Sequence, residues 1–283
     1  MRRWLDRAFY ALTAACCLTA CLILFGVVAT ILVRAAPVLD WQLLTQPMAE
    51  GGGAGGVLYQ ILGTLLLMVS ALAVSTPLAV ALALTTAVYF AGTRLQRWLN
   101  LWLYALNGVP SIVLGIFGLM FFMKVLEWGK SWLSGGILLG LMILPTLTIA
   151  LIERIECLPA KYLEAAAGLG LRRSQIIWSV VMPQSFSGLL SGALLGLARA
   201  AGETAPIMFT AAVFSGATFP QGIRESPVVA LPYHIFALAQ DSFSLGAQNR
   251  VWGAAWVLLL LVFGISLLAL PVRLRTHEEA KHG

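Results

Sequence analysis

Two charged residues, Arg199 and Glu203, are the strongest candidates for chemistry in this sequence, because both lie within an otherwise apolar segment. Their spacing of four residues would place both side chains on one face of a helix. An isolated charge inside a membrane costs about 2.5–3.5 kcal/mol or more, so such residues face one another or a polar path. The Arg199 guanidinium presents a fork of N–H donors that matches the oxygens of a phosphate anion. The pair therefore predicts either a transient anion contact, with Glu203 balancing the charge of an empty path, or an ion pair that braces the helices.

Hydroxyl groups near this pair are further candidates. Thr204 directly follows Glu203, and Ser111 lies in another apolar segment. Each hydroxyl would either donate a hydrogen bond to the same anion or bond back to its own helix. Prolines in these segments are expected to kink helices, and neighbouring glycines to allow close helix packing. The residues in question are Pro110, Pro145 and Pro206, and Gly108, Gly115 and Gly118.

The composition indicates that the elements carrying these residues cross a membrane. Hydrophobic residues make up 60% of the 283 residues, charged residues 11%, and the mean hydropathy is +0.89. Soluble domains have about 25% charged residues, and a helix needs about 20 apolar residues to span a bilayer. We therefore predict an all-α membrane protein, a single domain over residues 1–283, with six transmembrane helices. Their expected ranges are 8–33, 57–90, 99–126, 137–152, 183–213 and 251–270.

The distribution of basic residues predicts how the chain is oriented. Twelve of the 18 Lys and Arg residues fall on one side of the six predicted helices. Because the positive-inside rule places such residues in the cytoplasm, both termini are expected there. The protein itself is expected in the plasma (inner) membrane of a bacterium. The net charge of +6 is spread between the spans and indicates no nucleic-acid partner. The twelve residues are Arg2, Arg3, Arg7, Arg94, Arg97, Arg154, Lys161, Arg172, Arg173, Arg273, Arg275 and Lys281.

Two loops on the opposite side are longer than a connection requires. Residues 34–56 end in a glycine-rich run that is typical of a flexible hinge, with contact to an external partner as a further role. Residues 214–250 include an apolar piece, 233–239, that is too short to span a bilayer and is expected to be interfacial or re-entrant. His234 lies in this piece and is expected at a surface or interface rather than in catalysis.

The loop between the fourth and fifth predicted spans, residues 155–180, carries the most informative pattern. Residues 158–169 are expected to form a short amphipathic helix that ends at Gly168 and Gly170. A second helix is expected from Ser174, and Pro183 is expected to open the fifth span. Two helices joined by glycines would form a rigid knob for docking a partner. Alanine-rich sequence also favours helix by propensity alone, which is the plainer interpretation of this loop.

This loop resembles the EAA loop of type I ABC importer permeases, whose pattern is Glu-Ala-Ala, three residues, Gly, nine residues and Ile-x-Leu-Pro. The positions that match in register are Glu164, Ala165, Ala166, Gly170 and Pro183. Val180 and Met182 are apolar replacements for the isoleucine and leucine of the pattern. The resemblance implies the permease fold, with cytoplasmic coupling helices that sit in a cleft of an ATP-hydrolysing subunit. Small alanines would allow close approach there, and Glu164 would supply a polar contact.

Two further stretches are similar to the phosphate-transporter permeases, in particular the PstA type. One is residues 107–119, which contain Gly-Val-Pro-Ser, and the other is residues 197–211, in which Gly-Glu-Thr-Ala-Pro follows Arg199. The resemblance covers about residues 57–212 and implies one permease subunit of an ATP-driven phosphate import system, forming half of the translocation pathway. The implied partners are a sister permease subunit (PstC-type), two ATP-binding subunits and a periplasmic or extracellular phosphate-binding protein, besides membrane lipid.

Other functions have signatures that this sequence lacks. Without a Walker A loop the chain is expected to be no enzyme itself and to bind no cofactor, with ATP and Mg²⁺ on the partner ATPase subunits. The three histidines and four cysteines show no metal-ligand spacing. One alternative is an ABC importer permease for another solute, such as molybdate, sulfate or an organic ligand. The other is a standalone channel or secondary carrier, for which inverted repeats with broken helices would be expected.

Overall fold

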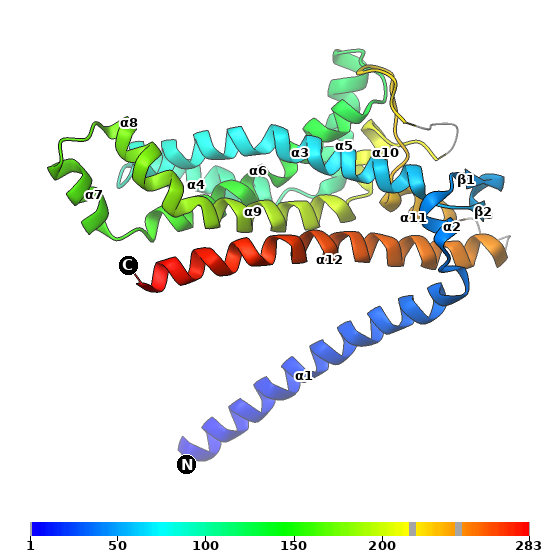
Figure 1. Cartoon of the computed structure of the whole chain (residues 1–283), viewed down its shortest axis with the longest axis horizontal. Helices are drawn as coiled ribbons and strands as arrows, with labels where there is room; N and C mark the ends of the chain where they lie inside the picture. The colour runs from blue at the N-terminus through cyan, green and yellow to red at the C-terminus, as the bar shows by residue number, and fades with distance from the viewer. Residues whose placement is uncertain (1, 215–218, 241–244, 283) are drawn as a thin grey trace. The chain divides into compact units, whose positions relative to one another are not determined.

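The computed structural model describes the backbone of residues 2–214, 219–240 and 245–282, which is mostly helical (Figure 1). Within these residues, five helices are long and apolar enough to cross a membrane, and one bent pair is a sixth candidate. The five are Phe9–Val38, Leu58–Tyr89, Trp132–Glu156, Arg173–Gly202 and Gln248–Leu267, and the bent pair is Arg94–Asn107 with Ser111–Val125. The predicted all-α membrane fold is confirmed.

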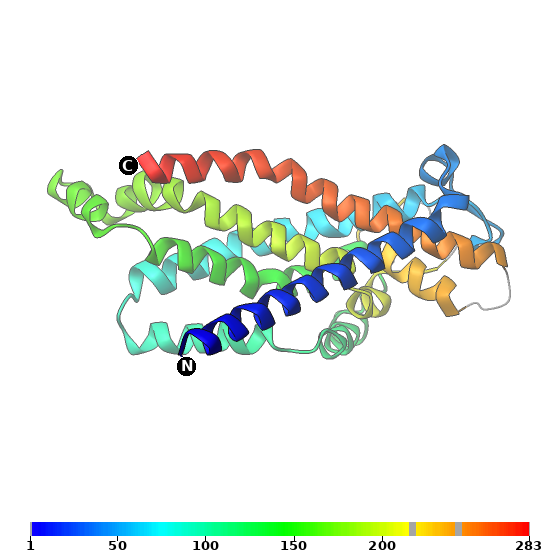
Figure 2. The same ribbon diagram turned by 90° about the horizontal axis from the view of Figure 1, so that it is seen from below.

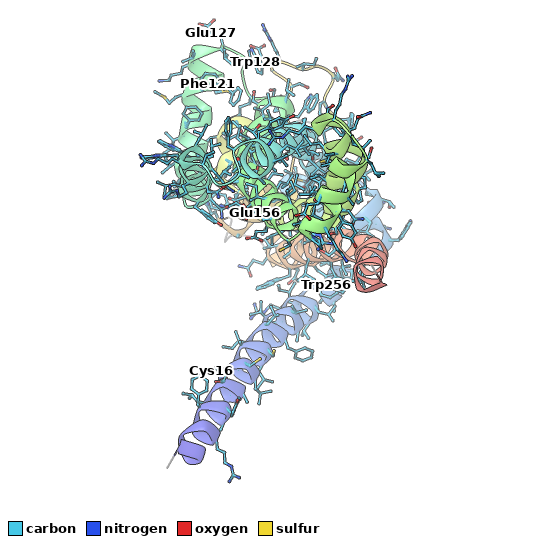
Figure 3. All side chains as sticks on the ribbon, turned by 90° about the vertical axis from the view of Figure 1, so that its left-hand side faces the viewer. Cys16, Phe121, Glu127, Trp128, Glu156 and Trp256 are labelled. Atoms are coloured by element: carbon cyan, nitrogen blue, oxygen red, sulfur yellow. The ribbon has the colours of Figure 1, made fainter. Side chains whose placement is uncertain are left out.

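The chain divides into two compact units. The first comprises Met1–Leu58 and Leu238–Val257, and the second comprises Tyr59–Ala237 and Leu258–Gly283. The first unit contains α1 (Arg2–Ala35), η1 (Ala36–Val38), α2 (Trp41–Thr45), β1 (Met48–Ala49), η2 (Glu50–Gly52) and β2 (Ala54–Gly55), together with the start of α12 (Leu245–His282). Side chains of α1, Cys16 among them, project on all sides of the helix (Figure 3). A helix that is apolar all round is suited to lipid as its solvent.

The glycine-rich run of the first unit is a short hairpin rather than the expected flexible hinge. β1 and β2 pair antiparallel, and the turn between them uses Gly51 and Gly52 at φ of 60° and 96°, where residues with a Cβ are strained. Arg250 donates from Nε to the carbonyl oxygen of Gly53 at 3.0 Å and from Nη1 to that of Gly55. Backbone pairing and the Arg250 side chain therefore hold a segment whose composition alone suggests a linker.

The second unit is a helix bundle with α6 at its centre. It contains nearly all of α3 (Leu58–Leu84), most of α11 (Leu231–Gln240), the rest of α12, and all of α4 (Arg94–Asn107), α5 (Ser111–Gly118), α6 (Trp132–Glu156), α7 (Ala160–Gly168), α8 (Arg173–Ile176), α9 (Met182–Gly202) and α10 (Ala205–Thr210). π-helical turns extend three of them: η3 (Thr85–Tyr89), η4 (Leu119–Val125) and η5 (Ile177–Val181). Leu139, Ile143 and Leu147 of α6 are buried among residues of α3, α9 and α10. In Figures 1 and 2, α6 and α9 run side by side.

The third predicted span is broken rather than continuous. α4 and α5 are bent by 90° at residues 108–110. Pro110 has no N–H to donate and disfavours helical backbone at Val109, so the helix ends at this point. The apolar side chains on both sides hide this break from a hydropathy profile.

The fifth predicted span differs at both ends. A continuous helix runs from Arg173 to Gly202, so Pro183 lies inside it and does not open it. The wide π turn η5 ends two residues before this proline and includes the position four residues before it, where the carbonyl group of a regular helix would clash with the proline ring. The helix ends where Glu203 adopts extended backbone, and α10 then forms a short separate helix with Pro206 in its first turn.

Candidate functional site

Arg199 lies in the last turn of α9 and has two partners. Its Nε is 3.7 Å from Glu203 Oε1, so the pair expected from the spacing of four residues is present. Its Nη1 donates a hydrogen bond of 2.9 Å to Asn107 Oδ1 at the end of α4. The side chains of Arg199 and Glu203 are 33% and 16% exposed. The guanidinium has five N–H donors, so these two contacts leave donors that an anion can reach.

Asn107 connects three helices at this point. Besides the bond from Arg199, its Oδ1 accepts a hydrogen bond of 3.3 Å from Thr146 Oγ1 of α6. One amide oxygen thereby joins the ends of α4 and α9 to the middle of α6. Neither Asn107 nor Thr146 is among the site residues predicted from the sequence. A polar amide directly before Gly-Val-Pro at membrane depth is the signal that points to Asn107.

Ser111 and Thr204 lie at two helix breaks that are close to one another. Ser111 is the first residue of α5, and Thr204 lies between α9 and α10. α5 and α10 pack in contact, since a Cβ placed on Gly115 would lie 3.1 Å from the oxygen of Ala205 and 2.9 Å from Phe209. The packing role expected for Gly115 therefore fits the structure. Both residues are half-buried, and their hydroxyls have no side-chain hydrogen-bond partner within the described residues.

A row of glycines on α9 sets the position of this site against α6. Gly188, Gly192 and Gly196 are spaced by four residues and lie on one helix face. A Cβ on Gly188 would lie 2.5 Å from Arg154 Cβ, and one on Gly192 would lie 3.0 Å from the Cα of Leu147. Small residues let membrane helices approach closely, and this contact holds the helix turn that carries Arg199. The sequence prediction did not include these three residues.

The loop at the other end of α9 has the expected helix–glycine–helix form. α7 covers Ala160–Gly168, and Gly170 follows at a φ of +75°, with no heavy atom within 4 Å of the position that a Cβ would occupy. Ala166 is buried, whereas Glu164 and Ala165 are exposed, and the Leu169 side chain is 81% exposed. The outward surface of α7 therefore presents small and apolar groups with one carboxylate.

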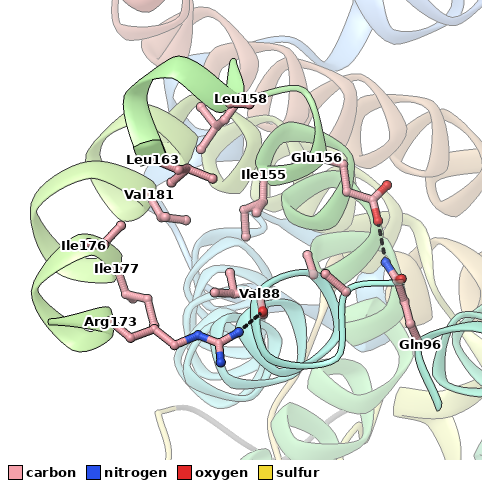
Figure 4. A pocket seen from close by; sticks show the side chains of 13 residues that line it. Val88, Gln96, Ile155, Glu156, Leu158, Leu163, Arg173, Ile176, Ile177 and Val181 are labelled. Atoms are coloured by element: carbon pink, nitrogen blue, oxygen red, sulfur yellow. Dashed lines mark hydrogen bonds between the residues drawn. The ribbon is translucent and has the colours of Figure 1, made fainter. Parts of the chain in front are cut away.

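A hollow of about 480 Å³ lies beneath α7, lined also by η3, the start of α4, the end of α6, α8 and η5 (Figure 4). At one side of it, Arg173 donates to the carbonyl oxygen of Val88, and its guanidinium lies 4.7 Å from the ring centre of Tyr89. At another side, Gln96 Nε2 donates to Glu156 Oε1 at 2.8 Å. These contacts tie the start of the helix that carries Arg199 to η3, and the start of α4 to the end of α6.

Comparison with known proteins shows the class to which this fold and site belong. The family model for the binding-protein-dependent transport system inner membrane component matches residues 75–274, and the chain belongs to this family. The family comprises permease subunits of ABC importers, which are not enzymes in themselves. Membership also implies association with ATP-binding subunits and a substrate-binding protein.

Several relatives are similar along most of their length. The phosphate transport system permease protein PstA 2 of Mycobacterium bovis is 32% identical over 275 residues, covering 94% of this chain and 87% of that protein. The probable phosphate transport system permease protein PstA of Methanocaldococcus jannaschii is 31% identical over 280 residues, covering 98% and 95%. The PstA protein of Haemophilus influenzae is 29% identical over 250 residues, covering 87% and 84%.

A solved structure confirms the fold. An inward-facing structure of the MetNI methionine ABC transporter matches with a TM-score of 0.59 over 78% of this chain and 94% of that chain. The sequence identity is 16%, so this likeness concerns the fold alone.

Proposed function

We propose that this chain is the transmembrane permease subunit of an ATP-driven phosphate importer and forms half of its translocation pathway. The names of its relatives support phosphate as the solute. The observation that carries the proposal is the Arg199 side chain, which is one-third exposed near two helix breaks and whose guanidinium has donors beyond those that face Asn107 and Glu203.

Arg199 would contact the anion transiently. The 3.7 Å between its Nε and Glu203 Oε1 is longer than a charge-assisted hydrogen bond, so an incoming phosphate oxygen can take over the guanidinium without breaking a strong bond. When the anion leaves, Glu203 would neutralise the charge of Arg199 again, so that the anion is not trapped at the guanidinium. The hydroxyls of Thr204 and Ser111 would add donors at the two breaks.

The coupling to ATP hydrolysis would run along a single helix. Arg173, which lies within the loop 155–180, and Arg199 belong to one continuous helix, Arg173–Gly202. An ATPase subunit that docks on Glu164 and Leu169 of the loop 155–180 and moves would therefore displace Arg199 as well. Such rigid-body motion is a common way to switch an interface between two states.

The expected partners are a sister permease of the PstC type, two ATP-binding subunits and an external phosphate-binding protein. Both termini are expected in the cytoplasm, in the inner membrane of a bacterium. Basic residues at the end of the second unit that carries α7 support this orientation. These residues are Arg94, Arg97, Arg154, Lys161, Arg172 and Arg173.

Radiolabelled phosphate uptake tests the proposal. Cells expressing the whole transporter are compared with wild-type, Arg199→Gln and Arg199→Lys subunits at matched membrane levels. Loss of uptake in Arg199→Gln with partial retention in Arg199→Lys is expected, since lysine keeps the charge but not the fork of donors. Unchanged uptake in both variants would make Arg199 a structural brace. Molybdate or sulfate uptake in place of phosphate would favour a permease for another solute.

A further inference from the structure

We propose that the first two turns of α4 bind the headgroup of an anionic phospholipid. An open hollow of about 370 Å³ lies there, lined by Arg94, Arg97, Trp98 and Leu101. The site concerns the lipid that surrounds the protein, and the inference is therefore independent of which solute the permease carries.

The two arginines lack an acidic partner. Both side chains are exposed, and neither forms an ion pair with an acidic residue of the described part of the chain. Glu156, which lies close to this end of α4, accepts its hydrogen bond from Gln96 instead. The first turn of α4 has no acidic residue. Because a helix N-terminus is its positive end, two cations there are unfavourable until an outside anion compensates them.

The order of side chains along α4 matches the order of groups in a phospholipid. Residues 94, 97, 98 and 101 follow a helical spacing that places them on one face. The guanidinium groups lie at the end of the helix, and the exposed Trp98 (59%) and Leu101 (58%) come next towards the middle of the span. Guanidinium groups fit phosphodiester oxygens, and tryptophan favours the level of the headgroups. Acyl chains would then cover Leu101.

A free phosphate ion fits this arrangement less well. It would contact the arginines but leave Trp98 and Leu101 uncovered, whereas a lipid contacts all four lining residues. Basic pockets at the ends of membrane helices are a known form of anionic-lipid recognition, because the anionic leaflet attracts each arginine near the surface. The combination of charge and apolar surface therefore points to a lipid.

Native mass spectrometry of the purified transporter complex tests the site. The complex is titrated with short-chain phosphatidylglycerol, and separately with phosphatidylcholine as the uncharged counterpart. Arg94→Gln/Arg97→Gln should weaken phosphatidylglycerol binding by about fivefold for each arginine removed, with little change for phosphatidylcholine. Arg94→Lys/Arg97→Lys should retain most of the binding. Arg7→Gln/Arg172→Gln removes two exposed arginines elsewhere and should bind as the wild type does.

Several outcomes would overturn the proposal. One is equal lipid binding by the wild type and the Arg94→Gln/Arg97→Gln variant, and another is an equal loss in the Arg7→Gln/Arg172→Gln control. Displacement of the lipid by inorganic phosphate at the same concentration would show that a bare anion suffices. Loss of a partner subunit from the variant complex, with lipid binding unchanged, would make this face of α4 a protein interface.

Discussion

Arg199 and Asn107 are 92 residues apart in the chain, yet Nη1 of the arginine donates to Oδ1 of the asparagine at 2.9 Å. The guanidinium is thereby held between a neutral oxygen from α4 and the carboxylate of Glu203. An amide oxygen can orient a guanidinium without cancelling its charge. We therefore infer that Asn107 positions Arg199 for an anion while Glu203 supplies the neutralising charge.

Changing Asn107 should alter phosphate affinity in a graded way. Asn107→Ala removes a hydrogen bond to a charged group, worth about 1.5–3 kcal/mol, and should raise the KM of uptake roughly tenfold or more. Asn107→Asp should raise it further, because a second carboxylate would hold Arg199 and repel the anion. Thr146→Val removes only the longer contact of 3.3 Å and serves as the control, with a small expected effect. Improved uptake by Asn107→Asp would contradict the positioning role.

The sequence predicts well those features that depend on short spacings. The ion pair of Arg199 and Glu203 follows from one helical turn, and it forms. The helix before Gly170 follows from local propensity and the glycine stop, and α7 lies where it is expected. Membrane helices follow from apolar length. None of these features requires knowledge of which helices pack against one another.

Features that depend on tertiary contacts cannot be predicted from the sequence alone. Asn107 cannot be paired with Arg199 from spacing, since the contact depends on how α4 and α9 meet. The break at residues 108–110 is invisible to hydropathy because both flanks are apolar. His234 is expected at a surface or interface but is only 3% exposed, because residues of the second unit, Phe214 among them, cover its ring. A short apolar helix does not reveal which of its faces is buried.

Close packing of α9 on α6 predicts a stability effect at Gly192. Gly192→Ala would place a Cβ 3.0 Å from both Ala150 Cβ and Leu147 Cα. Such overpacking costs typically about 1–3 kcal/mol and should lower the unfolding temperature of the purified complex. Gly264→Ala is the matched control, because no heavy atom lies within 4 Å of its Cβ and alanine favours helix. Equal stability of both variants would show that α6 and α9 are not in close contact.

His234 predicts a dependence of stability on pH. Burial lowers the pKa of its imidazole from 6.5 to about 4, so the folded protein keeps it neutral. Below pH 6.5 the unfolded chain binds the proton more readily, and stability falls as the pH is lowered from about 6.5 towards 4. This difference in pKa between the unfolded and the folded state corresponds to on the order of 3 kcal/mol in the free energy of unfolding. Between pH 7 and pH 4 the unfolding temperature should decrease less for His234→Phe than for the wild type. An equal decrease in both proteins would exclude His234 as the origin of the pH dependence.

Gly170 and Gly168 form a matched pair for testing the coupling loop. No heavy atom lies within 4 Å of a Cβ built on either residue, so alanine meets no steric obstacle at either position. They differ in backbone, because Gly170 has a φ of +75° whereas Gly168 ends α7 with ordinary helical backbone. Alanine at Gly170 is therefore strained by about 1 kcal/mol or more, which should shift the exposed surface of Glu164 and Leu169 relative to α8.

Gly170→Ala should consequently uncouple ATP hydrolysis from phosphate uptake, as should Glu164→Ala, which removes the exposed carboxylate of α7. Gly168→Ala should leave both activities close to the wild-type level. The measurement is the ratio of phosphate transported to ATP hydrolysed, in proteoliposomes containing the whole transporter at matched protein content. A lower ratio in Gly170→Ala but not in Gly168→Ala would trace the defect to the left-handed backbone. The same ratio in all three variants would mean that motion of the ATPase reaches Arg199 by a route that does not depend on this loop.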